Sequence, residues 1–136
     1  MKTRQLAGLF VLLIACSSVA YSQSPVEEFS FQIKDFKMDH QTQTNNLNIS
    51  ISYQYIANIQ KPDYPDFRWL AKDVETLLSN YPNKDDYWEI VNKQITSMLL
   101  NKYRGLTSVT CEIKVDPSSL IPYTRTSRVT RNRKRT

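Results

Sequence analysis

The chain has 136 residues, enough for one domain with a single core. Its formal net charge is +5, from 18 basic and 13 acidic residues. Six of the basic residues lie between Arg125 and Arg135, so the excess belongs to the C-terminal end and does not indicate a nucleic-acid-binding body.

The first 22 residues have the organisation of an export signal. Lys2 and Arg4 precede an apolar stretch from Leu6 to Ala15, which is too short to span a membrane as a mature helix. Small residues favour a cut after Ser22. A second cut stays open, because the letters LIAC ending at Cys16 resemble a bacterial lipobox, and Cys16 would then carry a lipid. Both alternatives predict export, to a periplasmic or secreted state or to a lipid-anchored one.

A cut after Ser22 leaves one cysteine, Cys111, and one histidine, His40, so no internal disulfide can form in that mature chain. An ordinary zinc site needs three or four protein ligands, so we predict no metal. Cys111 lies on the apolar side of a predicted strand and is read as a core residue. His40 falls in a predicted loop, where it offers no base for a catalytic thiol.

Two alternating segments predict a β-hairpin. Apolar residues alternate with polar ones from Phe29 to Ile33, and the phase changes after Asp35, which predicts a bulge. Residues 39–46 (DHQTQTNN) form a predicted polar turn, and alternation resumes from Leu47 to Tyr55. One solvated face indicates an antiparallel sheet.

Two amphipathic helices are predicted next. From Phe67 to Tyr81 the apolar residues recur at the spacing of one helix face, and Asp66 is placed to cap the first amides. A second helix is predicted from Tyr87 to Tyr103. Asp86 and Glu89 stand three residues apart at its start, which is the spacing of a capping box.

The remaining elements complete an α+β domain over residues 23–131. Gly105 is predicted to end the second helix in a left-handed conformation, and strict alternation from Val109 to Val115 predicts the third strand. Residues 124–131 are polar and β-branched and predict a fourth, edge strand, followed by a frayed basic tail at 132–136. The predicted fold is a four-stranded antiparallel sheet, in the order ββααββ, with both helices on one face.

Short motifs punctuate these elements in a recognisable order: Asp66-Phe67, Glu89, Asp116-Pro117, Ile121-Pro122 and Arg131. In this order the chain resembles the tunnelling-fold (T-fold) enzymes, and most closely dihydroneopterin aldolase, over about residues 66–131. The resemblance implies a barrel of several subunits with pockets at the subunit boundaries. It also implies that Glu89 would anchor the ring nitrogens of a flat heterocycle, with Phe67 beside it. The competing interpretation is that Glu89 only caps its own helix.

The catalytic positions of that family are not retained. The family uses a tyrosine after the aspartate and a lysine before the proline for proton transfer, and this chain has Phe67 and Asp116 there. We therefore predict no catalytic residues and no cofactor, and we name Glu89 and Phe67 as ligand-binding candidates.

Two hypotheses follow from these observations. The first is an exported, non-catalytic module that acts by self-assembly or by binding a partner or a small heterocyclic ligand. The alternative is a pterin- or purine-directed enzyme. A homo-oligomer is predicted because a lone four-stranded sheet has two open edges, and because Ile90 and Leu100 extend the apolar stripe of the second helix. No nucleic-acid partner is expected, and a membrane would be reached only through a lipid on Cys16.

Overall fold

The computed structural model describes Ser18 and residues 25–135. Both cleavage sites of the export signal, and Cys16, lie outside the described residues. No helix in the described part of the chain is long and apolar enough to cross a membrane. The elements, in chain order, are β1 (Glu28–His40), β2 (Gln43–Tyr55), the 3₁₀ helix η1 (Lys61–Asp63), α1 (Phe67–Ser79), α2 (Trp88–Lys102), β3 (Leu106–Val115) and β4 (Arg125–Asn132).

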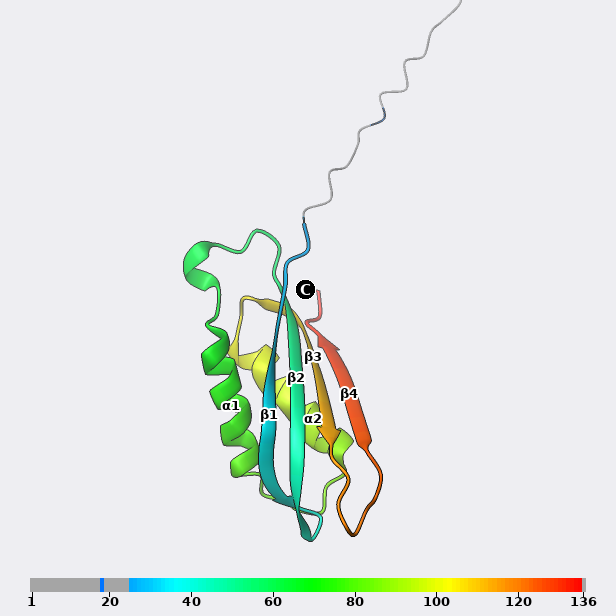
Figure 1. Ribbon diagram of the computed structural model, residues 1–136. Helices are drawn as coiled ribbons and strands as arrows, with labels where there is room; N and C mark the ends of the chain where they lie inside the picture. Colours follow the sequence, from blue (N-terminus) through cyan, green and yellow to red (C-terminus); the bar gives the residue numbers. More distant parts are fainter. Residues whose placement is uncertain (1–17, 19–24, 136) are drawn as a thin grey trace, which may run out of the picture.

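The four strands form one antiparallel sheet in the order β1-β2-β3-β4, and both helices lie on the same face of it. Figure 1 shows α1 beside β1 and α2 behind β3 and β4. The predicted fold class is confirmed. Because neighbouring strands follow each other in sequence, β1 and β4 are the two outer strands, and each has one unpaired edge.

The core is the layer between the sheet and the helices. Inward residues of β2 and β3 alternate with polar ones, and they pack against Leu70, Val74 and Leu78 of α1 and the apolar stripe of α2. Each such side chain contributes about 1.5–3 kcal/mol when it leaves water. Cys111 is among them and fully buried, which confirms its core assignment. Burial raises the pKa of its thiol, so it is no nucleophile.

The β1–β2 hairpin is tighter than predicted. Its turn is only Gln41 and Thr42, both with positive φ (51° and 64°), and the strands pair up to His40 and Gln43. The predicted eight-residue loop was therefore wrong. The Asn45 side chain donates hydrogen bonds to the carbonyls of Met38, His40 and Gln43, so it satisfies groups that a polar loop would expose.

The predicted bulge in β1 is confirmed. The register between β1 and β2 shifts between Ile33 and Phe36, and Asp35 has a φ of 55°. Its backbone N–H donates to Asn48 Oδ1 at 3.3 Å. The extra residue keeps apolar side chains on the helix side of both halves of the strand.

The first helix begins as predicted, but the second does not. Asp66 caps α1 by accepting a hydrogen bond from the Arg68 amide. The N-cap of α2 is Tyr87, which makes no side-chain capping bond. Asp86 is engaged elsewhere, because its carboxylate accepts from Tyr81 Oη at 2.6 Å and from Asn83 Nδ2 at 2.7 Å. The predicted capping box with Glu89 was therefore wrong.

Gly105 also serves a different purpose from the predicted one. It has no positive φ. A Cβ at this position would lie 2.9 Å from the Asp63 carbonyl oxygen and 3.1 Å from Ile59 Cδ1. Gly105 is required because the loop after β2 packs directly on the turn between α2 and β3.

The C-terminal end is ordered further than predicted. β4 runs to Asn132, and the Arg133 guanidinium donates to the carbonyls of Leu100 (2.5 Å), Leu106 (3.0 Å) and Tyr103 (3.3 Å). These carbonyls include the negative end of α2, which a cation stabilises. The sequence predicted that Leu100 and Ile90 would lie beyond the main apolar stripe of α2. Leu100 is only 4% exposed and belongs to the core, so the prediction was wrong for Leu100, whereas Ile90 is 39% exposed.

Candidate functional site

The unpaired edge of β1 carries aromatic side chains. Phe67, the first residue of α1, lies with its ring centroid 5.5 Å from that of Phe29 and 5.9 Å from that of Phe31. Phe67 and Phe29 are 41% and 40% exposed. These three residues form the β1-edge cluster, an apolar surface beside a row of unpaired backbone groups.

A small pocket of about 180 Å³ lies where the outer strand β4 begins. The start of α2, the end of β3 and the start of β4 line it, with residues Tyr87, Trp88, Glu89, Val115 and 125–127. We call it the β4-edge pocket. Glu89 is exposed, and its carboxylate takes part in no salt bridge and no helix cap among residues 25–135.

Several hydrogen-bond donors belong to residues that line the same pocket as Glu89. The first amides of α2 have no side-chain cap. Two lining residues hold buried nitrogens that have no partner within the described residues, Trp88 Nε1 and Arg125 Nε. An unpaired buried donor is costly, and native structures rarely keep one without a reason. The pocket can thus offer a carboxylate to N–H groups and donors to an oxygen.

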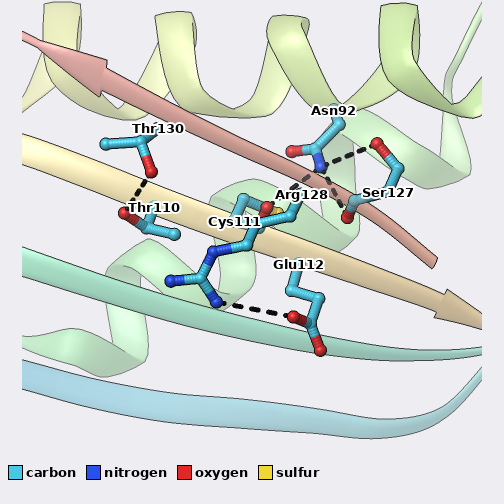
Figure 2. Close-up of polar contacts among 7 residues, drawn as sticks. All are labelled: Asn92, Thr110, Cys111, Glu112, Ser127, Arg128 and Thr130. Atoms are coloured by element: carbon cyan, nitrogen blue, oxygen red, sulfur yellow. Dashed lines mark hydrogen bonds and ion pairs between the residues drawn. The ribbon is translucent and has the colours of Figure 1, made fainter.

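Asn92 fixes the wall of this pocket. Its Nδ2 donates to the carbonyls of Cys111 and Ser127, both at 3.0 Å, and lies 3.2 Å from Ser127 Oγ (Figure 2). Two further contacts tie β3 to β4, the Arg128–Glu112 salt bridge at 3.5 Å and the Thr110–Thr130 hydroxyl pair at 2.8 Å. Sequence reasoning missed Asn92, although it lies four residues after Trp88 on the buried face of the helix.

Glu89 and Phe67 are not brought together within one chain. Phe67 packs on β1, whereas Glu89 lines a pocket with β4, at the opposite edge of the sheet. The pocket is also smaller than the roughly 300–1,000 Å³ that small-molecule sites usually occupy. The two candidates can share a ligand only if the β1 edge of one copy meets the β4 edge of another.

Asp116, which the sequence resemblance predicts to stand in place of the family's lysine, is a fixed carboxylate. Asp116, directly after β3, accepts hydrogen bonds from Asn46 Nδ2 at 2.6 Å and from Asn48 Nδ2 at 3.4 Å. These contacts position an acceptor where an ammonium would donate. Phe67 has no hydroxyl with which to donate a proton, and the Asp116 carboxylate cannot stabilise negative charge as an ammonium does.

His40 was predicted to lie in a loop, and this was wrong. It is the last residue of β1 and is 1% exposed. Its Nε2 donates to the Asp86 carbonyl at 2.7 Å, and its ring centroid lies 4.7 Å from that of Trp88. No group of three or more histidine, cysteine, aspartate or glutamate side chains within residues 25–135 could hold a metal ion.

Two solved structures share this architecture. A dihydroneopterin aldolase from Burkholderia thailendensis, crystallised with guanine, superposes with a TM-score of 0.58 and 10% identity, over 79% of this chain and 93% of that one. A putative dihydroneopterin aldolase from Vibrio cholerae gives a TM-score of 0.58 and 8% identity, over 77% of this chain and 98% of that one. No protein-family model matches the chain, and no curated protein matches it in sequence.

The chain therefore has the T-fold, as the dihydroneopterin aldolases do, and the predicted structural resemblance is confirmed. At such low identity the likeness defines the fold, and activity has to be argued from the site.

Proposed function

We propose that this chain is an exported, non-catalytic T-fold module, which assembles with copies of itself edge to edge and binds a small flat ligand where two copies meet. One observation carries the proposal. The two candidate ligand-binding residues lie at the starts of the two helices, Phe67 of α1 against outer strand β1 and Glu89 of α2 beside outer strand β4, so each copy holds two complementary halves of a site. Heterologous contacts of this kind generate rings when the rotation closes.

The charges of the two outer strands support unlike edges meeting. β4 contains three arginines and no acidic residue, which gives +3. β1 contains two lysines and three acidic residues, so its charge is 2 − 3 = −1 with its histidine neutral. Pairing β4 with β4 would set arginines against arginines, whereas pairing β1 with β4 sets opposite charges together.

The chemistry of the β4-edge pocket suggests the class of ligand. Glu89 can accept two N–H groups, and the donors of Arg125 and the start of α2 can reach a neighbouring oxygen. A flat heterocycle with adjacent N–H and carbonyl groups has this pattern. The guanine bound to the Burkholderia aldolase has it as well, which supports the proposal.

The alternative is an enzyme that acts on a pterin or a purine. The free carboxylate of Glu89 favours it, but Phe67 and Asp116 oppose it. Incubating the mature chain with dihydroneopterin separates the two. Turnover above the no-enzyme rate would favour the enzyme, and binding without turnover favours the module.

Light scattering of the mature chain, residues 23–136, tests self-assembly. We expect an oligomer at tens of micromolar in low and moderate salt, and dissociation in Phe29→Lys, because a charge on the β1-edge cluster blocks edge pairing. Ile56→Lys is the matched control, since Ile56 is 38% exposed but lies outside both edges. A strict monomer in both salts would overturn the assembly proposal.

Fluorescence titration with neopterin tests the ligand class. We expect saturable binding to the oligomer and a loss of about tenfold or more in Glu89→Gln, because the amide offers one acceptor in place of two. Glu75→Gln on α1 is the control, as Glu75 is equally an exposed acid but lines neither edge. Equal affinities in both variants would remove Glu89 from the site.

A further inference from the structure

A second hollow lies at the other end of α2, away from Glu89. The loop after β2, the start of α1 and the segment from Lys102 to Gly105 enclose about 680 Å³. We call it the helix-end groove. Its volume falls within the range of small-molecule sites, which is roughly 300–1,000 Å³.

Aromatic rings form its walls. Trp69, in the first turn of α1, is 60% exposed, whereas the only other tryptophan, Trp88, is 7% exposed. Tyr64 and Tyr103 complete the aromatic lining. A tryptophan exposed to this degree costs hydration free energy in the unliganded protein, which is typical of a surface that receives a ligand.

The tyrosine walls are already held in place. Tyr64 Oη donates to Glu27 Oε2 at 2.5 Å, and its ring centroid lies 4.8 Å from that of Tyr55. Tyr103 Oη donates to Asp73 Oδ2 at 2.5 Å. Since these rings need no reordering on binding, a ligand gains their contact at low entropic cost.

The charges in the groove cancel. Two acids, Asp63 and Asp66, and two bases, Lys102 and Arg104, line it, so the sum is zero. Asp66 is paired with Arg68, and Lys102 with Asp73. Asp63 and Arg104 take part in no salt bridge in the described part of the chain, which leaves one acceptor and one donor for a ligand.

Gly105 keeps that acceptor and that donor on one rim. The backbone of Asp63 can approach to within 2.9 Å of the position of a Cβ on Gly105, and Arg104 directly precedes Gly105. The groove therefore combines an exposed apolar ring with a carboxylate and a guanidinium of opposite charge.

We propose that the helix-end groove binds an uncharged saccharide. The C–H face of a sugar ring is apolar and can cover Trp69, while its hydroxyls both donate and accept. Asp63 then accepts from one hydroxyl, and Arg104 donates to another. An anion would meet the unpaired Asp63 carboxylate and a cation the unpaired Arg104 guanidinium, and a purely apolar ligand would leave both groups desolvated without partners.

The probe is triacetylchitotriose, an uncharged trisaccharide, added to the mature chain. Because Trp69 is the exposed tryptophan, its fluorescence should change saturably, with a dissociation constant in the millimolar range or below. Calorimetry should show about tenfold weaker binding for Trp69→Ala, Asp63→Asn and Arg104→Gln. Tyr123→Ala is the control, as Tyr123 is 70% exposed but lies outside the groove, and its affinity should be unchanged.

Charged trisaccharides test the charge argument. Chitotriose, which is cationic, and trigalacturonate, which is anionic, should both bind more weakly than triacetylchitotriose. No binding of the uncharged probe, equal affinity in Trp69→Ala, or tighter binding of either charged probe would overturn the proposal. A proline-rich peptide that binds in place of the trisaccharide would assign the groove to a peptide. The monomeric Phe29→Lys variant should keep its saccharide affinity, so this test is independent of assembly.

Discussion

Replacing Asn92 with alanine tests whether one buried amide holds β4 against α2. Asn92 is fully buried, and its Nδ2 donates to the carbonyls of Cys111 on β3 and Ser127 on β4. Alanine removes both hydrogen bonds and leaves a small cavity. An unsatisfied buried acceptor costs about 1–3 kcal/mol. Since a carbonyl in a strand can keep a second partner, we take the lower part of this range for each and expect a loss of about 2–3 kcal/mol.

Urea unfolding of the mature chain, followed by circular dichroism, measures this loss. With a denaturant slope of about 1–3 kcal/mol per molar, the midpoint should fall by about 1–2 M. Wild type and variants have to be compared at one dilute concentration, because self-association raises apparent stability. Asn101→Ala is the control, since exposed Asn101 on the same helix only reaches Ser97 Oγ, at 3.4 Å. A loss below about 0.5 kcal/mol in Asn92→Ala would refute the reasoning.

Three further predictions concern other parts of the domain. Burial, the larger cause, and the hydrogen bond to the Asp86 carboxylate, the next, raise the pKa of Tyr81 from 10.0 to about 12. The contribution of Tyr81 to the free energy of unfolding should therefore be complete below pH 10 and be lost as the pH rises towards 12. Urea unfolding at several pH values should show this fall, and it should be smaller in Tyr81→Phe. Arg133→Ala should lose about 1–2 kcal/mol of unfolding free energy in urea, because three carbonyls lose their cationic donor. Arg135→Ala is the control, since Arg135 is exposed, and a comparable loss in that variant would show a general charge effect. The mature chain should not cleave dihydroneopterin, because Phe67 cannot donate a proton and Asp116 cannot stabilise negative charge as a lysine does, and product formation in a chromatographic assay would show a different active site.

The fold was predictable because most of its elements bury only one face. β3 alternates buried and polar residues almost without exception, and α1 carries its buried residues at helical spacing. Even the bulge at Asp35 was visible, because an extra residue reverses the alternation. These signals are local, because an element that is buried on one face has apolar residues at a fixed spacing in the sequence.

The predictions of local structure were wrong where a residue interacts with a partner that is distant in the sequence. The hairpin turn of Gln41 and Thr42 contains no glycine, and Asn45, which satisfies the surrounding carbonyls, read as part of a polar loop. Gly105 matched a helix-ending signal, but the reason for it lies in Asp63, 42 residues earlier (105 − 63). Spacing rules cannot supply such long-range partners.

The failed capping box bears directly on function. From spacing alone, Asp86 and Glu89 should satisfy the start of α2 between them, and Glu89 would then have a purely structural role. Instead, Asp86 accepts from Tyr81 and Asn83, and its carbonyl accepts from His40, so it serves the connection between the helices. Folding alone does not explain an uncapped helix start beside unpaired buried donors, because both of these cost stability. Violations of local rules concentrate at functional sites. Their meeting at an open sheet edge is therefore the strongest argument that the start of α2 is completed by something outside the single chain.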